Sequence, residues 1–309
     1  MHIAQVQSWP EGPRYVTIDD PPAPSENQIQ LRVLAAGAHQ VVRSRASGLH
    51  YSARELPHTV GVDCVGKDEA TGNIYYLFTL QGGTFAERIN VEKSVLYPLP
   101  RNVDPVSFAA SVNPAMSSWM AITNRTDNLP KDFTAVIIGA TSASGRLAAC
   151  SAKALGAGKI IGVGRNAATL EAVDGLDDYL VLRDPVAETD FSKVHDCDLV
   201  LDYVYGDATV HLLSSLSKTK KPVQYVEIGS LAQRTADIPS HLLRSFDLTI
   251  RGAGAGSWSI SALQKELHTL IPTMAQWKLL SANSRPLKDI GTAWSDASLA
   301  SEGRLVFVP

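Results

Sequence analysis

The sequence predicts an α/β protein in two parts, a β-rich N-terminal part followed by a doubly wound parallel sheet. Up to Pro105 the chain consists mainly of strand candidates with closely spaced turn signals. After Pro105, strand candidates alternate with helix candidates, which is typical of a parallel sheet covered on both faces. A turn of small residues between an apolar strand and a helix lies at the centre of this alternating part.

Composition restricts the class of protein. The 309 residues suffice for two domains, and 45% hydrophobic with 19% charged residues is ordinary for a globular chain. A net charge of −3 provides no basic field for nucleic acid or an anionic membrane. No apolar run reaches transmembrane length and the N-terminus lacks a secretion signal, so we expect a cytoplasmic protein. Cys64, Cys150 and Cys197 are far apart and are expected to be reduced thiols.

The N-terminal part is predicted from alternation and turns. Residues 3–7 and 15–19 are expected to form a hairpin, and Gln28–Ala36 alternates apolar and polar residues as a half-buried strand does. A helical or irregular segment is expected over Gly37–Gly48. Three further strands are expected at residues 59–66, 73–79 and 83–91, an arrangement typical of a small barrel.

The second part is predicted to start with two helices, one capped by Asp104 and running through Ala110, the other over Pro114–Thr123. Beyond the central unit, strands are expected at residues 179–182, 198–204, 223–228 and 248–252, with helices at 207–217 and 240–246. With the two strands of the central unit this makes six strands, as in the doubly wound nucleotide-binding fold. A long helix over Ser259–Leu279 and a strand over Arg304–Val308 complete the chain.

The central unit has the form of a dinucleotide-binding crossover. Ala135–Ile138 is an apolar strand, Arg146–Leu155 has helical periodicity, and Ile160–Val163 begins a second strand. The whole βαβ unit spans about 30 residues, the expected size. The turn brings backbone N–H groups and a helix N-terminus together, which is an anion site suited to a pyrophosphate.

The glycine pattern of this turn departs from the strict G-x-G-x-x-G fingerprint, since Ser142 takes a position where glycine is more usual. Such a turn can also serve packing alone, but the flanking strands and helix favour a cofactor. The residues predicted to hold the pyrophosphate are Gly139, Thr141, Ser142, Ala143, Ser144 and Gly145.

The end of the second strand indicates which dinucleotide binds. Enzymes that prefer NAD usually carry Asp or Glu here for the ribose hydroxyls, whereas this chain reads Gly164-Arg165-Asn166. A guanidinium is suited to a phosphate and attracts the 2′-phosphate that distinguishes NADP. The alternative is an arginine that is merely solvated on a loop. We predict NADPH as the cofactor.

Several segments in the same order resemble the medium-chain dehydrogenase/reductase superfamily, and in particular its zinc-free quinone oxidoreductase branch. The segments that carry the resemblance are Asp20–Pro24, Leu31–Gly37, Leu56–Gly66, Gly82–Glu87, Pro98–Pro100, Asn113–Trp119 and Glu227–Ser230. The resemblance implies a GroES-like catalytic domain at residues 1–112 and 260–309 and a Rossmann NADP-binding domain at residues 113–259. It also implies a homodimer, because Leu248–Arg251 is similar to the edge strand through which relatives pair their sheets.

Zinc-containing relatives need Cys, His and Cys as metal ligands. The first of those regions here reads Gly37-Ala38-His39-Gln40, and the segment corresponding to G-H-E reads Gly61-Val62-Asp63. Neither offers the family's ligand, so we expect no metal site. The zinc-free branch often carries N-P-x-D after the first glycine, and His39–Val42 departs from this pattern too.

The resemblance also implies site residues. Its cleft segment offers three candidate proton handlers: Tyr51 as a general acid, and His39 and His50 as proton relays. Each has the alternative of a packing or surface residue. Asn113, Ser117 and Trp119 align with a helix that borders the nicotinamide. Asn113 and Ser117 are expected to bind the cofactor and Trp119 to contact the substrate, although Trp119 can equally be a core residue. Gly229 and Ser230 are expected to bind the cofactor at the carboxyl end of the sheet, and Trp258 to contact the substrate or lie at the domain junction.

The expected function is an NADPH-dependent, zinc-independent reductase of an electron-poor C=C bond or a quinone. Without a Lewis acid, conjugate reduction is favoured because the negative charge spreads into an enolate or hydroquinone anion, which hydrogen bonds and a proton can stabilise. Two alternatives remain open: a carbonyl or imine reductase acting on a biosynthetic intermediate, and an NADPH-binding protein without redox turnover. In each case the partner is a small molecule.

Overall fold

The computed structural model describes residues 1–50, 52–53, 55–301 and 303–309, without the side chains of residues 300 and 301. The chain divides into two compact units. Unit 1 comprises Met1–Asn113 and Leu267–Pro309, and unit 2 comprises Pro114–Glu266. Two helices, α2 (Pro105–Arg125) and α7 (Ile260–Met274), contribute residues to both units.

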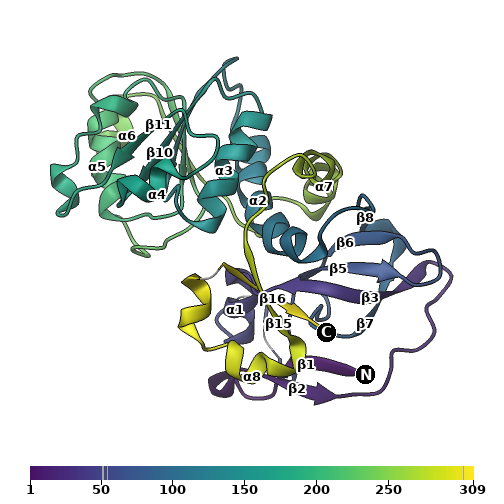
Figure 1. Ribbon diagram of the computed structural model, residues 1–309. Coiled ribbons are helices and arrows are strands. Elements are labelled where there is room, and N and C mark those ends of the chain that lie inside the picture. Colours follow the sequence, from purple (N-terminus) through teal and green to yellow (C-terminus); the bar gives the residue numbers. More distant parts are fainter. Residues whose placement is uncertain (51, 54, 302) are drawn as a thin grey trace. The chain divides into compact units, whose positions relative to one another are not determined.

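Unit 1 is rich in strands (Figure 1). Its strands are β1 (His2–Val6), β2 (Pro13–Thr17), β3 (Gln28–Gly37), β4 (His58–Thr59), β5 (Asp63–Asp68), β6 (Ile74–Phe78), β7 (Arg88–Glu92), β8 (Leu96–Pro98), β15 (Ala282–Pro286) and β16 (Arg304–Val308). The described residues form one sheet in the order β15-β16-β3-β5-β6-β8, with β7 also paired to β3, and a second in the order β2-β1-β4. Helices α1 (Gln40–Ala46) and α8 (Ile290–Ala293) accompany them.

The core of unit 1 combines distant parts of the chain. Val6, Val33 and Cys64 from the N-terminal strands pack in one buried cluster with Ile290 and Phe307 from the C-terminal segment. Burying such side chains stabilises the fold by about 1.5–3 kcal/mol each. The C-terminal segment is therefore an integral part of unit 1.

Unit 2 contains a parallel sheet in the order β11-β10-β9-β12-β13-β14 (Figure 1). The strands are β9 (Thr134–Ile138), β10 (Lys159–Gly164), β11 (Asp178–Val181), β12 (Leu199–Asp202), β13 (Val223–Glu227) and β14 (Leu248–Gly252). In order of appearance this is 3-2-1-4-5-6, the doubly wound order of dinucleotide-binding domains. The predicted fold class is confirmed.

Helices cover both faces of this sheet, as the apolar residues of β9 illustrate. Ala135 and Ile137 lie in one buried cluster and Val136 and Ile138 in another. The first cluster includes residues of α2, α3 (Ala143–Ala154) and α4 (Ala167–Glu171), and the second includes residues of α5 (Asp207–Leu216) and α6 (Leu242–Ser245). A strand buried on both faces needs a continuous apolar run, which is what β9 has.

Three local predictions were wrong. The two helices expected around Pro114 are one helix, α2, with Pro114 inside it. The long helix after Gly256 ends at Met274 rather than Leu279. The polar segment Ala282–Pro286 was not expected to be a strand, yet it pairs in parallel with β16.

Candidate functional site

The carboxyl edge of the parallel sheet in unit 2 brings the predicted cofactor residues together. Gly139 follows β9, Gly164 ends β10, and Gly229 follows β13. Because β9 is flanked by β10 and β12, and β12 by β13, these ends lie along one edge. Ligands of open α/β sheets bind at this edge, where the strand order reverses.

The turn after β9 is shaped by two glycines. Gly139 has φ +86°, a backbone conformation that a side chain disfavours. A Cβ on Gly145 would lie 2.2 Å from the carbonyl oxygen of Gly139 and 2.7 Å from the Cα of Ala140. Position 145 therefore admits only glycine without rearrangement, and the start of α3 approaches the end of β9 closely.

Ser142 explains the departure from the glycine fingerprint. It is the N-cap of α3, and its Oγ accepts a hydrogen bond of 3.0 Å from the amide of Gly145. The amides of Ala143 and Ser144, the first two helical residues, have no acceptor within the helix. A serine here stabilises the helix start while those two donors remain suited to an anion such as a pyrophosphate.

Arg165 lies directly beyond β10 and is exposed to solvent. In the described part of the chain, no hydrogen bond or ion pair engages its guanidinium. Asn166 has a structural role beside it, since its Oδ1 accepts a 3.1 Å hydrogen bond from the amide of Thr169 and caps α4. The cation at this edge is therefore available to a ligand, while its neighbour holds the backbone in place.

A second arginine near this position was missed in the sequence. Gly164 is paired with Val181, and the amide of Leu182 donates to the carbonyl of Gly164 at 2.8 Å, so β11 ends beside β10. Arg183 follows at this edge and is exposed, and its backbone amide is bonded to the Thr189 hydroxyl at 2.9 Å. The available signal was an arginine just after the strand candidate 179–182.

Tyr203 is another residue that the sequence did not reveal. It follows β12, and its hydroxyl lies 3.4 Å from the Ser117 hydroxyl of α2. A Cβ on Gly139 would lie 3.4 Å from the Cβ of Tyr203, and one on Gly229 would lie 3.4 Å from its carbonyl oxygen. Tyr203 thus lies next to three of the predicted cofactor residues, Ser117, Gly139 and Gly229. Burial raises its pKa to about 12, so its phenol is protonated near neutral pH.

The turn after β12 is held by a buried carboxylate, Asp202. It accepts hydrogen bonds from the amides of Val204 at 2.7 Å and Tyr205 at 3.0 Å. It also accepts from the hydroxyls of Thr209 and Tyr225, both at 2.6 Å. Four donors satisfy the buried charge and fix the edge on which Tyr203 lies.

The remaining predicted residues are less clearly brought together. Trp119 is 3% exposed and its indole N–H donates to Glu266 at 2.8 Å, an arrangement that favours a packing role. Trp258 is partly buried against the core of unit 2. Ser230 is exposed after Gly229. Asn113 is the last residue of the N-terminal segment of unit 1 and is partly buried.

The candidate proton handlers lie in unit 1. His39 is 1% exposed, and its Nε2 lies 3.2 Å from an oxygen of Asp63. His50 Nδ1 lies 2.8 Å from the Ser52 hydroxyl; burial and then the charge of Arg45 lower the pKa of His50, so it is neutral near pH 7. Tyr51 lies outside the described residues.

Among the residues that the structure describes, no group of three or more His, Cys, Asp or Glu side chains is arranged to hold a metal ion. In the same part of the chain, no helix combines the length and the apolar character needed to cross a membrane.

The comparisons with known proteins identify the chain's relatives. No family model matches the chain. The protein named probable NADPH-dependent quinone reductase tdiC, of Emericella nidulans, is 35% identical over all of both chains. A quinone oxidoreductase of Sus scrofa is 30% identical over 46% of this chain and 45% of its own.

The solved structures agree with this at the level of the fold. A Thermus thermophilus quinone oxidoreductase, solved alone and with NADPH, has a TM-score of 0.81 at 22% identity over the whole of both chains. An Escherichia coli quinone oxidoreductase complexed with NADPH has a TM-score of 0.79 at 20% identity, again over the whole of both chains. With the full-length 35% relative, they show that the chain is an oxidoreductase that belongs to the quinone oxidoreductase branch of the medium-chain dehydrogenase/reductase superfamily.

Proposed function

We propose that this chain is an NADPH-dependent reductase that transfers hydride to a quinone or to the electron-poor C=C bond of an enone. The observation that carries the proposal is the 35% identity, over all of both chains, to a protein named an NADPH-dependent quinone reductase. When bound, NADPH supplies the hydride from C4 of its nicotinamide ring.

The residues of unit 2 fit this cofactor. The turn Gly139–Gly145 has no room for a Cβ at its last position and presents the two amides at the start of α3 to a pyrophosphate. Arg165, with Arg183 at the end of the neighbouring strand, supplies positive charge for the 2′-phosphate. We assign the nicotinamide half of NADPH to residues farther along the carboxyl edge of the sheet, namely Gly229, Ser230 and the Ser117–Tyr203 pair.

The proton that completes the reduction comes from unit 1 or from solvent. The candidates are His39, His50 and Tyr51, as predicted from the sequence. The lowered pKa of His50 leaves its ring neutral near pH 7, so little of it is in the protonated form that can donate to the substrate.

The test is a spectrophotometric assay of NADPH oxidation at 340 nm with quinones, enones and simple ketones as acceptors, and with NADH in parallel. We expect oxidation with quinones or enones and a preference for NADPH. Turnover restricted to ketones or imines would select a carbonyl or imine reductase. NADPH binding in a thermal-shift assay without oxidation of any acceptor would refute the proposal in favour of a non-redox NADPH-binding protein.

The proposal includes a homodimer formed through β14. This strand is at the edge of the sheet and pairs only with β13 in the described structure of unit 2. Ile250 in its middle is 39% exposed, so the strand presents both unpaired backbone groups and an apolar side chain. Light scattering should give the mass of a dimer, and Ile250→Glu should shift it toward the monomer. The cytoplasmic location expected from the sequence also belongs to the proposal and is tested with a fluorescent fusion.

A further inference from the structure

Tyr205 has a backbone conformation that its residue type disfavours. Its φ is +60°, in the left-handed region where a Cβ crowds the backbone. In the described chain, the other non-glycine residues with positive φ are Asn128, Asp132 and Lys220, and asparagine and aspartate tolerate this region. Gly206 follows with φ +83°. A bulky aromatic residue is therefore strained at a turn where glycine or asparagine would fit more easily.

This turn lies at the carboxyl edge of the sheet, beside the cofactor residues. Tyr205 is three residues beyond the last residue of β12. Its neighbour Val204 lies against the dinucleotide turn, since a Cβ on Gly139 would be 3.1 Å from Val204 Cγ2. β12 lies on one side of β9, whereas β10 and β11, whose ends carry the arginines assigned to the 2′-phosphate, lie on the other. Because a dinucleotide spans the two halves of such a sheet, the turn after β12 belongs to the nicotinamide half.

Contacts on both sides impose the conformation of the turn. On one side, the Tyr205 amide donates to Asp202 Oδ1 at 3.0 Å. On the other side, the Asp207 amide donates to Gln233 Oε1 at 2.9 Å, and Gln233 Nε2 donates to the Asp207 carboxylate at 3.1 Å. These bonds tie the turn to the segment that follows β13. Strained backbone persists only where its surroundings fix it, and in folded proteins it is concentrated at ligand-binding and active sites.

The Tyr205 side chain has no structural contact that explains the strain. Within the described part of the chain, nothing hydrogen-bonds to its hydroxyl or packs ring against ring with it, and the residue is partly exposed. It also belongs to neither of the two core clusters that cover the faces of the sheet. Tyr203, two residues earlier, is 4% exposed, belongs to the first of these clusters and has its hydroxyl beside Ser117. The ring of Tyr205 is thus available to a ligand.

We propose that Tyr205 is a further cofactor-binding residue, whose ring packs against the nicotinamide half of bound NADPH. The inference rests on the proposed function, in which NADPH donates the hydride. The contact is non-covalent, and an aromatic side chain suits it because it presents a large apolar face to another planar ring. The chain keeps tyrosine at a strained position because the ring is used for binding, as happens where stability and function conflict.

The test is isothermal titration calorimetry with NADPH, NADH and 2′,5′-ADP, which carries the adenosine half and the 2′-phosphate but no nicotinamide. Tyr205→Asn removes the ring and introduces a residue that tolerates the left-handed conformation. We expect the Kd of NADPH and of NADH to rise by about 3- to 10-fold, and the Kd of 2′,5′-ADP to stay within about twofold. Tyr205→Phe keeps the ring and should bind all three ligands as the wild type does.

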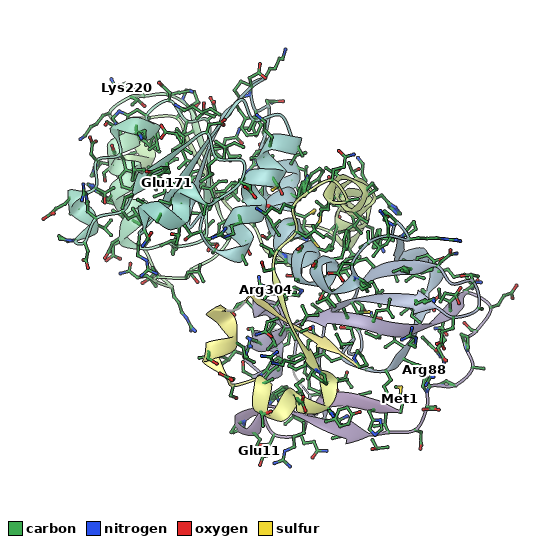
Figure 2. The ribbon with its side chains drawn as sticks, viewed as in Figure 1. Met1, Glu11, Arg88, Glu171, Lys220 and Arg304 are labelled. Carbon is green, nitrogen blue, oxygen red and sulfur yellow. The ribbon has the colours of Figure 1, made fainter. Side chains whose placement is uncertain are left out.

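Lys220→Asn is the matched control. Lys220 also has a left-handed backbone, with φ +57°, but it precedes β13 and so lies at the opposite end of that strand from Gly229 (Figure 2). Its replacement should leave the Kd of all three ligands unchanged. Melting curves provide the second measurement: Tyr205→Asn should melt no lower than the wild type, because the substitution relieves strain and breaks no core packing.

Three outcomes would overturn the inference. The first is a Kd of NADPH in Tyr205→Asn equal to that of the wild type. The second is an equal loss of affinity for NADPH and for 2′,5′-ADP, together with a lower melting temperature, because the ring would then serve the fold. The third is a loss in Tyr205→Phe as large as that in Tyr205→Asn, because the hydroxyl would then make the contact. Failure of the wild type to bind NADPH would refute the proposed function itself.

Discussion

Replacing Arg165 should reverse much of the chain's preference for NADPH over NADH. The guanidinium lies at the end of β10 with no protein partner among the described residues, so its removal leaves no buried group unsatisfied. The variant Arg165→Gln should therefore fold as stably as the wild type. What it loses is attraction to the 2′-phosphate, which NADH lacks.

The size of the effect follows from the exposure of the site. A hydrogen bond to a charged group contributes about 1.5–3 kcal/mol, and solvent around an exposed side chain reduces this toward about 1–2 kcal/mol. Each 1.4 kcal/mol is a factor of about ten, so the Kd of NADPH should rise by about 5- to 30-fold while the Kd of NADH is unchanged. Arg165→Asp should do more, because a like charge at about 6 Å from a dianion in water adds about 1.4 kcal/mol of repulsion.

The assay is the quenching of protein fluorescence by NADPH and NADH at low and at high salt. Lys159→Gln is the matched control, because Lys159 is an exposed cation at the opposite end of the same strand. High salt should reduce the change in the Kd of NADPH that Arg165→Gln causes, and the Kd of Lys159→Gln should stay equal to that of the wild type. An equal loss of affinity for NADPH and for NADH in Arg165→Gln would refute the assignment of the 2′-phosphate to Arg165. A loss of NADPH affinity in Lys159→Gln as large as that in Arg165→Gln would refute it too. A residual preference for NADPH that disappears in the double variant with Arg183→Gln would identify the second cation.

Three further predictions concern stability. Ser142→Ala removes the cap of α3 and should lower the unfolding free energy by about 1 kcal/mol in urea denaturation; no change would contradict the capping role. Gly145→Ala places a Cβ 2.2 Å from a backbone oxygen and should lower the unfolding free energy by about 1–3 kcal/mol and weaken NADPH binding; wild-type values for both would contradict the close approach. Burial and the charge of Asp202 raise the pKa of Glu227 above its ordinary 4.5, so its ionised form opposes folding. Glu227→Gln should be more stable than the wild type at pH 7, with the difference disappearing below about pH 4; a less stable variant at pH 7 would contradict this sign.

Much of unit 2 could be predicted from the sequence because its signals are local. The strand Leu248–Gly252 lies where its apolar run placed it, as does the C-terminal strand Arg304–Val308 of unit 1. The βαβ unit around Gly139 was recognisable because a buried parallel strand, a small-residue turn and an amphipathic helix each have a composition of their own. The presence of Arg165 at the end of β10 followed directly from its place in the sequence.

Other features needed the tertiary structure. Pro114 is a helix breaker by local preference, yet α2 continues through it. Ala282–Pro286 has the composition of a loop and becomes a strand only because β16 offers a partner. The sequence showed that His39 and Asp63 lie in the two segments that carry metal ligands in zinc-containing relatives. It did not show that these two side chains contact each other.

The physical reason for this division is the range of the interactions. Periodicity, turn chemistry and capping act within a few residues, so the sequence by itself determined the two-part α/β organisation, the dinucleotide turn and the cation after β10. The contact between His39 and Asp63 depends on the antiparallel pairing of β3 with β5, and the contact between Ser117 and Tyr203 joins residues 86 positions apart. Contacts of this kind arise from packing between distant segments, so only the tertiary structure decided which chemical groups of this oxidoreductase face one another.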